Sequence, residues 1–519
     1  MKTCFKYIVL FLCAAVLGAC YKDLSTEATF QIPDIEITSE SYPDDIINIP
    51  YGQTLDISVD VKQEGRDADD FSYLWEVDLV AGNSNDRQEI GDGPSVSYQV
   101  ASSPSDTPYT LTVCVTDLQT GYATYRKWNM YVVSSLGEGL LVAHTRNGGQ
   151  TSELDLLSCA PVTYGYEGDE PLYTRNLYAL ANNGAVIEGK VNSLTARVAS
   201  NGAVFNESRI MMAYGDHLCS IDPISYEVDK LDSELFGLSE ESTYNTSLAF
   251  NYAAYFSGAI VNGYLYVVIC NSDNSYSKAS YSMDPSNIFT PYNLAYAKQD
   301  QGIVGVFDEV HSAFFYIYGW QSASGGFTAV EGSTSFSLTG AVCVAAGCLS
   351  DSSLAFVLKA ADNTYHLCIV YKNGNNIDID DYALDAPEID KAVSFGFCDN
   401  ADLFYYATEN SIYPVILSGD KATVGNALTW TPENSEEKIT SIRQYQQGWY
   451  GTHQYGLNDY EFILSTNRSQ VIITTYNETT GEGKIYLNPF VVSTGRFTMS
   501  DNGVYGGFGE ITAICSTLR

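Results

Sequence analysis

The sequence predicts an all-β protein, in which a small N-terminal β-sandwich is followed by a β-propeller of seven or eight blades. Alternating runs of about four to eight residues rich in Val, Ile, Tyr, Phe and Thr recur along the chain, and Asn-Gly, Gly-Asp and Asp-Asn turns separate them. Hardly any convincing helical pattern follows the N-terminal segment. From residue 136 onward the strand groups recur about every 45–55 residues, which is close to the ~40–50 residues of a four-stranded propeller blade.

The N-terminus has the pattern of a signal peptide at residues 1–19. Lys2 and Lys6 precede an apolar run at residues 7–16. This run of about ten residues is too short to span the ~30 Å hydrocarbon core of a bilayer as a helix. We therefore expect the segment to be removed on export.

Cys20 is the predicted site of lipidation. Residues 17–20 are Leu-Gly-Ala-Cys, an apolar residue and two small ones before the cysteine, which is the pattern of a lipobox. The Lys-Asp pair at 22–23 resembles the surface-export signal of Bacteroides-type lipoproteins. We expect residues 20–32 to form a lipidated tether that holds the protein on the outer membrane, facing the cell exterior.

The charge of the chain limits its partners. The 63 acidic and 26 basic residues give a net charge of −37, and removal of Lys2 and Lys6 with the signal peptide makes it −39. Such a charge repels nucleic acid and anionic lipid headgroups. The 40 tyrosines suit half-buried strands, and they also suit wet recognition surfaces.

Residues 33–135 are predicted to form the β-sandwich. Trp75 lies in a strand-like run and is the large aromatic residue that such sandwiches bury between their sheets. At residues 113–121 we expect a hairpin in which Asp117 bonds the turn backbone and Gly121 takes a positive φ. The expected strands are 34–38, 54–61, 73–80, 95–100, 109–116 and 122–133.

Residues 136–519 are predicted to form the β-propeller. Several strand groups share one form: a turn, an aromatic-rich strand, a short turn and a second strand. Examples lie at residues 262–268, 307–318, 401–415 and 458–486. Length divided by period gives seven or eight blades. No WD or kelch motif accompanies the period.

Several motifs together resemble a known family. The Tyr-x-Trp strand at 73–75 and the Val-x-Val-Thr-Asp-x-x-x-Gly hairpin at 113–121 resemble a PKD domain. With the lipobox, Gly-Leu-Leu-Val at 139–142 and the aromatic motif at 403–413, the mature chain resembles the PKD-like family lipoproteins of Bacteroidales. This resemblance implies surface nutrient capture beside a TonB-dependent outer-membrane transporter, and it supplies no catalytic residues.

The cysteines are expected to be free thiols. Nine remain in the mature chain besides Cys20, an odd number without a CxxC pair, and most lie in apolar runs. A bridge between Cys343 and Cys348 is the alternative that their spacing leaves open.

No catalytic, metal-binding or cofactor-binding residue is predicted. The five histidines are scattered, and neither a nucleophile elbow nor a phosphate-binding loop occurs. The acidic run at 378–381 lacks the glycine and the distal glutamate of an EF-hand, so a solvated turn is the preferred interpretation. A facing pair of carboxylates, as in glycosidases, stays open among 63 acidic residues.

Aromatic residues in loops are the predicted ligand-binding residues. Trp320 lies in a polar, glycine-rich segment at 318–326, and Trp449 and Tyr450 lie in a second one at 447–456. Exposed rings stack on sugars or hold peptide side chains. The alternative is that these rings pack between blades.

These observations favour a non-catalytic surface lipoprotein that captures an oligosaccharide or a peptide for a neighbouring transporter. Two other functions stay open. One is a propeller-type hydrolase or lyase of polysaccharide, and the other is a surface adhesin or scaffold that contacts protein.

Overall fold

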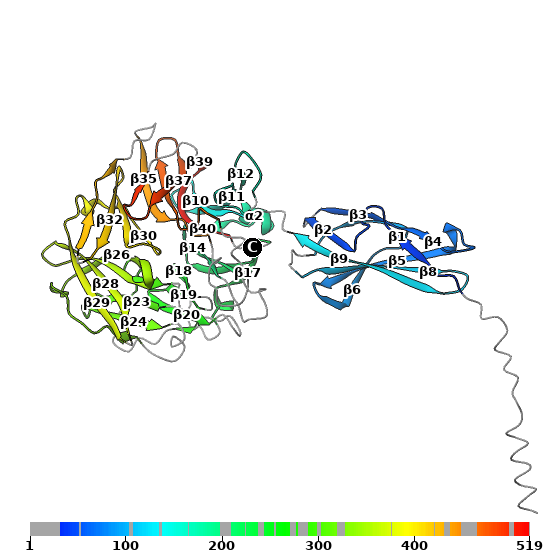
Figure 1. Cartoon of the computed structure of the whole chain (residues 1–519), viewed down its shortest axis with the longest axis horizontal. Coiled ribbons are helices and arrows are strands. Elements are labelled where there is room, and N and C mark those ends of the chain that lie inside the picture. The colour runs from blue at the N-terminus through cyan, green and yellow to red at the C-terminus, as the bar shows by residue number, and fades with distance from the viewer. Residues whose placement is uncertain are drawn as a thin grey trace, which may run out of the picture. The chain divides into compact units, whose positions relative to one another are not determined.

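The computed structural model divides the chain into two compact units, Met1–Ser135 and Leu136–Arg519. Strands are the predominant secondary structure of the described residues in each unit (Figure 1). The structure describes residues 32–50, 53–102, 107–133, 138–164, 166–197, 209–223, 225–236, 243–253, 256–269, 277–278, 289–297, 303–318, 327–374, 376–419, 421–429, 436–447, 464–497 and 503–517.

The N-terminal unit is a β-sandwich. Its larger sheet has the order β2-β9-β8-β5-β6, in which only the β2–β9 pair is parallel. Two further antiparallel pairs, β3–β7 and β1–β4, complete the sandwich. The strands are β1 (Glu36–Thr38), β2 (Ile46–Pro50), β3 (Thr54–Ser58), β4 (Asp60–Lys62), β5 (Phe71–Val80), β6 (Asn83–Gly91), β7 (Ser95–Gln99), β8 (Tyr109–Asp117) and β9 (Ala123–Val133).

Two tryptophans fill the centre of this unit. Trp75 on β5 is fully buried, as predicted, and its ring stacks on that of Trp128 with the ring centroids 5.8 Å apart. The indole N–H of Trp75 donates to the carbonyl oxygen of Gly93 at 2.8 Å, so the polar end of the buried side chain has a partner.

The hairpin between β8 and β9 also has the predicted chemistry. The carboxylate of Asp117 accepts the backbone N–H of Gln119 at 2.8 Å and the hydroxyl of Thr120 at 2.7 Å. Gly121 has a φ of 73°, a conformation that side chains with a Cβ rarely adopt. The guanidinium of Arg66, 3.0 Å from the same carboxylate, is a contact that the local pattern did not predict.

The second unit is a β-propeller, and its described part forms seven sheets. The described residues thus form seven blades, one of the two predicted numbers. The first blade has β10 (Leu140–Thr145), β11 (Thr151–Ser158), β12 (Leu172–Thr174), β13 (Ile187–Glu188) and β40 (Glu510–Ser516). The second has β14 (Val191–Arg197), β15 (Arg209–Tyr214), β16 (His217–Ile221) and β17 (Val228–Leu231). The third has β18 (Thr246–Ala253), β19 (Phe256–Val261), β20 (Tyr264–Ile269) and β21 (Ser277–Lys278).

The remaining four blades follow in chain order. The fourth has β22 (Leu294–Ala297), β23 (Ile303–Asp308), β24 (Ala313–Tyr318) and β25 (Thr328–Ala329). The fifth has β26 (Val342–Cys348), β27 (Leu354–Lys359), β28 (Tyr365–Asn373) and β29 (Asn376–Leu384). The sixth has β30 (Ser394–Cys398), β31 (Leu403–Ala407), β32 (Ser411–Ser418), β33 (Lys421–Val424) and β34 (Leu428–Thr429). The seventh has β35 (Glu437–Gln444), β36 (Gln470–Asn477), β37 (Glu482–Val491), β38 (Arg496–Phe497) and β39 (Val504–Phe508).

The described helices are short. The one α-helix among them is α2 (Leu177–Ala181), between β12 and β13 of the first blade, and the others are single 3₁₀ turns. These turns are Ala68–Asp70, Asp232–Glu234, Ser350–Ser352 and Ile389–Lys391. Within the described residues no helix is long and apolar enough to cross a membrane.

The ring of blades is closed by the C-terminal strand. β40 pairs antiparallel with β10, so that Leu140 lies opposite Ser516 and Thr145 opposite Glu510. The first blade therefore combines the two ends of the propeller in one sheet. β40 also lies against β14, as the inner strands β30 and β35 lie against each other.

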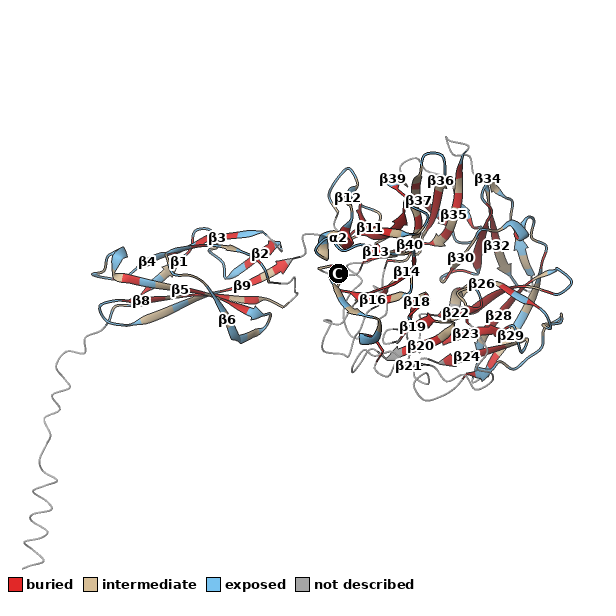
Figure 2. Cartoon of the chain, turned by 180° about the vertical axis from the view of Figure 1, so that it is seen from behind, coloured by how far each residue is buried: buried red, intermediate tan, exposed pale blue. Residues whose placement is uncertain are grey.

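The hydrophobic core lies between blades. Seven clusters of buried residues each join two neighbouring blades, and together they close the circle. Figure 2 shows buried residues along the strands in the interior of each unit and exposed residues on the loops. Burial of apolar side chains between successive sheets is thus the main force that holds the ring together.

The eight described cysteines are free. Five of them are buried, and Cys343 and Cys348, the nearest pair in sequence, form no bridge. The expectation of free thiols is confirmed for these eight residues, and Cys270 lies outside the described part of the chain.

Candidate functional site

A cavity of about 240 Å³ lies where the inner strands of the propeller converge. Thr195 from β14, Tyr296 from β22, Phe397 from β30, Arg443 from β35 and Cys515 from β40 line it, among others. Each of these residues belongs to the C-terminal half of its strand. The inner strands therefore run in the same direction, and five of the seven blades contribute to one site.

Two aromatic rings form part of the wall. The ring of Tyr296 stacks on Phe250 with centroids 4.6 Å apart, and that of Phe397 stacks on Phe404 at 5.1 Å. Both lining rings are therefore held in place by a neighbouring ring, Tyr296 by one on the adjacent blade and Phe397 by one on its own blade. Burial raises the pKa of Tyr296 to about 12, although the charge of Arg443 acts in the opposite direction. At neutral pH the Tyr296 hydroxyl is protonated and can donate a hydrogen bond.

Arg443 supplies the positive charge of the cavity. Its Nη1 donates to the carbonyl oxygen of Ile514 on β40 at 2.8 Å. Burial lowers the pKa of its guanidinium, because removal from water disfavours the charged form. The remaining N–H groups of this side chain have no hydrogen bond to the described residues, and none of the described carboxylates forms an ion pair with it.

Polar groups hold the chain at the end of β35. The side-chain amide of Gln444 donates to Oδ1 of Asn400 at 2.6 Å, and its oxygen accepts the backbone N–H of Asp399 at 3.1 Å. The hydroxyl of Ser516 donates to the carbonyl oxygen of Gln446 at 2.8 Å. These bonds join the seventh blade to the sixth and to the closing strand, so they fix the wall that carries Arg443.

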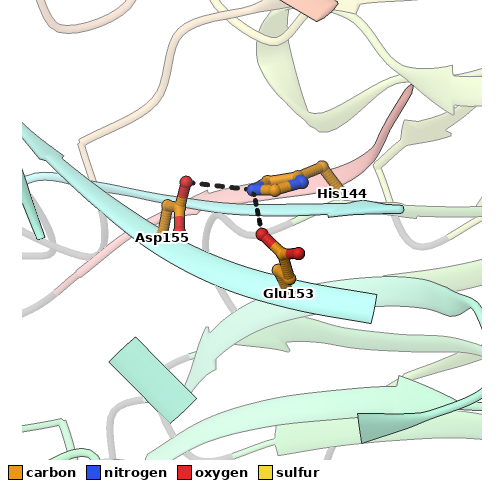
Figure 3. A group of neighbouring side chains, drawn as sticks. All are labelled: His144, Glu153 and Asp155. Atoms are coloured by element: carbon orange, nitrogen blue, oxygen red, sulfur yellow. Dashed lines mark hydrogen bonds and ion pairs between the residues drawn. The ribbon is translucent and has the colours of Figure 1, made fainter. Parts of the chain in front are cut away.

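A second group of side chains, His144, Glu153 and Asp155, could hold a metal by composition and spacing. Figure 3 shows the imidazole of His144 between the two carboxylates of β11. Its Nε2 lies 2.9 Å from Oδ2 of Asp155 and 3.8 Å from Oε2 of Glu153. His144 and Asp155 are both buried.

The hydrogen bonds of this group do not fit a metal. The backbone N–H of Gly509 donates to Nδ1 of His144 at 3.1 Å, so Nδ1 carries the lone pair and Nε2 carries the proton. Nε2 then donates to Asp155 and has no lone pair for a cation. Nη1 of Arg175 is already 2.7 Å from the same oxygen of Asp155.

These residues instead form a structural clasp at the ring closure, which we define as His144, Asp155, Arg175 and Gly509. It joins β10 and β11 to the segment that precedes β40. The Arg175 guanidinium also lies 4.9 Å from the ring centroid of Phe508, next to Gly509. The arrangement ties the two ends of the propeller together.

A larger hollow of about 800 Å³ lies on the fifth blade, beside His366. Nε2 of His366 is 3.0 Å from the Thr364 hydroxyl, which is also 2.6 Å from a carboxylate oxygen of Asp362. The ring of Phe336 stacks on His366 at 3.7 Å. One blade and its adjoining loop supply this wall, whereas five blades build the cavity at the inner strands. That cavity is therefore our candidate site.

Comparisons with known proteins found weak similarities to solved structures. No protein-family model matches this chain, and no curated protein matches it. A catalytically inactive virginiamycin B lyase from Staphylococcus aureus, solved with quinupristin, is similar with a TM-score of 0.37 and 10% identity over 63% of this chain and 95% of that one. The WD40 domain of SCAP from fission yeast gives 0.32 and 11%, over 63% and 73%. Sqt1 from Chaetomium thermophilum gives 0.36 and 9%, over 72% and 87%. The likeness concerns the fold alone.

The site residues predicted from sequence are not among the described ones. Cys20, Trp320, Trp449 and Tyr450 are all outside the described residues, so their roles stay predictions. Arg443 was not singled out from the sequence. An arginine in the otherwise uncharged run at 439–447, in a chain with so few basic residues, is the signal that could have found it.

Proposed function

We propose that this chain is a lipid-anchored protein of the outer-membrane surface that captures a nutrient, an oligosaccharide or a peptide, for a neighbouring TonB-dependent transporter. The propeller is the capturing domain in this proposal. The propeller binds the ligand in the cavity at the inner strands.

The composition of the cavity carries the proposal. Propellers commonly bind ligands at the ends of the inner strands, and binding sites combine apolar surface with a few placed polar groups. Here Phe397 and Tyr296 supply the rings, while Thr195, Arg443 and the Tyr296 hydroxyl supply hydrogen-bond donors. The volume of about 240 Å³ suits one unit of a ligand, such as a single sugar or amino acid.

The proposed localisation rests on the sequence pattern of the N-terminus. A multiply acylated cysteine anchors a protein stably, and a signal peptide with a lipobox leads to that modification. A strongly acidic surface favours solubility outside the cell. Together these features support display on the membrane rather than insertion into it.

Binding to glycan and peptide arrays tests this function. The mature chain with Cys20→Ala, which is unacylated, should be retained by a subset of oligosaccharides or peptides. Thr195→Trp adds a large side chain to the half-buried wall of the cavity, so it should abolish retention. Thr423→Trp is the matched control, because Thr423 is exposed on the outermost strand β33, and it should bind normally.

Two results would contradict the proposal. One is that no oligosaccharide or peptide retains the protein. The other is that Thr195→Trp and Thr423→Trp retain ligand equally, with unchanged melting temperatures. Release of shortened sugars from a retained polysaccharide would identify a polysaccharide-cleaving enzyme instead.

A further inference from the structure

The charges of the described arginines follow a simple rule. Most lie within 4.0 Å of a carboxylate, as Arg175 does with Asp155 at 2.7 Å and Arg468 with Asp399 at 2.7 Å. Among the arginine side chains that the structure describes, the exceptions are Arg443 and Arg496. Arg496 is exposed on β38, where water solvates its charge.

Arg443 differs because it is half-buried and lines the cavity at the inner strands. A guanidinium removed from water without a counter-ion is costly, and proteins usually pair such a group with a carboxylate. This chain has 63 acidic residues, yet none of the described ones approaches Arg443. A single hydrogen bond to the Ile514 carbonyl leaves most of its five N–H groups available.

A second donor faces the same space. Tyr296 comes from β22, on another blade, and its hydroxyl has no hydrogen bond to the described residues. The charge of Arg443 acts on this hydroxyl, which places the two groups within electrostatic reach. A cation and a hydroxyl donor around one small cavity match the two oxygens of a carboxylate.

We propose that the cavity holds a carboxylate of the captured ligand, with Arg443 as its counter-ion and Tyr296 as a second donor. This inference rests on the proposed capture function and names the ligand class for it. The carboxylate belongs either to an acidic sugar or to an acidic amino-acid side chain, and both present the same group. Because the whole protein is acidic, Arg443 makes the cavity the place where an anionic ligand is stabilised.

Matched pairs of probes test the charge requirement and distinguish the two sources. Isothermal titration of the mature chain with Cys20→Ala uses D-galacturonate against D-galactose. A second pair of probes compares N-acetylglutamate α-amide with N-acetylglutamine α-amide, which differ only in the charge of the side chain. In at least one pair, the acid should bind at least about tenfold more tightly than its neutral partner, because an ion pair with hydrogen bonds is lost with the charge. The pair that shows the preference identifies the source of the carboxylate.

Variants assign the preference to the cavity. Arg443→Gln should remove the preference for the acid, and Arg443→Lys should keep part of it, since lysine retains the charge without the planar fork. Tyr296→Phe should weaken acid binding with a smaller effect. Arg496→Gln is the matched control, because it removes an arginine without a carboxylate partner that lies outside the cavity, and its titrations should equal those of the unsubstituted protein.

The melting temperature separates recognition from a purely structural role. Arg443→Gln should melt at the same temperature or higher, because it removes an unpaired charge from the interior. A lower melting temperature, without any acid preference in the parent protein, would make Arg443 only a tie between β35 and β40 and would overturn the inference. Equal binding of acid and neutral probes, or of neither, would also overturn it, even where arrays still show capture of neutral ligands. Failure of all array binding would overturn the capture function itself.

Discussion

Asp155 shows how a buried charge can serve the fold. Its side chain is 1% exposed, and it receives hydrogen bonds from His144, from Arg175 and from the backbone N–H of Asn176. Burial raises the pKa of this carboxyl, but the hydrogen bonds outweigh burial, so its pKa lies below the ordinary value. Exposed ion pairs elsewhere on the surface contribute only about 0–1 kcal/mol. Arg443 is the opposite case, a partly buried charge that the described part of the fold does not pair.

We predict that Asp155→Asn destabilises the propeller at neutral pH by about 1–3 kcal/mol, because it replaces a charge-assisted bond to Arg175. A carboxyl with a lowered pKa stabilises the fold above its unfolded pKa of about 3.9, and this contribution disappears as the pH falls through the folded pKa. The difference between parent and variant should therefore shrink below about pH 4. Urea unfolding at pH 7 and pH 3 measures it.

The matched control for this variant is Glu153→Gln, which changes a half-buried carboxylate 3.8 Å from the same imidazole. It should alter unfolding by less than about 1 kcal/mol at both pH values. If the loss of unfolding free energy in Asp155→Asn is the same at pH 7 and pH 3, the charge of Asp155 does not stabilise the clasp.

Contacts between inner strands explain why some of their positions carry glycine. A Cβ added to Gly396 on β30 would lie 2.6 Å from the carbonyl oxygen of Ile442 on β35. A Cβ at Gly347 on β26 would lie 2.3 Å from the ring of Phe397. Neighbouring blades therefore approach so closely near the cavity that a single methyl group does not fit. This close packing positions Phe397 and Arg443.

We predict that Gly396→Ala costs about 1–3 kcal/mol, because the neighbouring strand must shift to admit the methyl group. The melting temperature should fall by several degrees. Gly506→Ala is the control, since its nearest contact is the end of the flexible Glu482 side chain at 2.8 Å, which can move aside. Equal melting temperatures for the two variants would show that the blade contact is looser than described.

Local patterns predicted most strands but not all. Six of the sandwich strands followed from alternating apolar residues, as did the Asn262-Gly263 turn, whose φ angles are 52° and 79°. β6 was missed because it is a polar edge strand of Asn, Asp, Arg, Gln and Glu residues. β2 was missed because its short apolar run ends at Pro50 and pairs in parallel with a distant strand.

The cavity could not be predicted for a different reason. The repeat length predicts seven or eight blades, but which side chain faces the central axis depends on how each inner strand is rotated. Thr195, Tyr296 and Arg443 share no local motif and are about 100 and 150 residues apart in sequence, roughly two and three blades. Likewise, nothing near Leu140 marks it as the partner of Ser516. Pairing of such distant strands depends on the closed ring rather than on local preference.

In the proposed function, the whole molecule combines an anchor, a sandwich and a capturing domain along one chain. The predicted lipid signal is at residues 1–20, the first unit ends at Ser135, and the propeller follows. This order suits a protein that stays on the membrane while its C-terminal unit meets ligands. The acidic charge of the chain disfavours nucleic acid as a partner. In the proposed function, a local cation attracts the ligand instead.

We predict that Cys20→Ala leaves the protein unacylated and moves it from membrane to soluble fractions. Cell fractionation followed by immunoblotting measures the change, and Cys114→Ala is a control with an ordinary cysteine of the sandwich. Protease added to intact cells should degrade the parent protein if it faces the exterior. Full membrane retention of Cys20→Ala would contradict the anchor.

The central claim is that the ligand enters the cavity at the C-terminal ends of the inner strands. A crystal structure of the mature chain with Cys20→Ala, in complex with the ligand most strongly retained on the arrays, tests it directly. We predict ligand density in this cavity, within hydrogen-bonding distance of Arg443 and Tyr296. Density only in the hollow beside His366, on the outer strands or on the sandwich, with the cavity holding solvent alone, would contradict the claim.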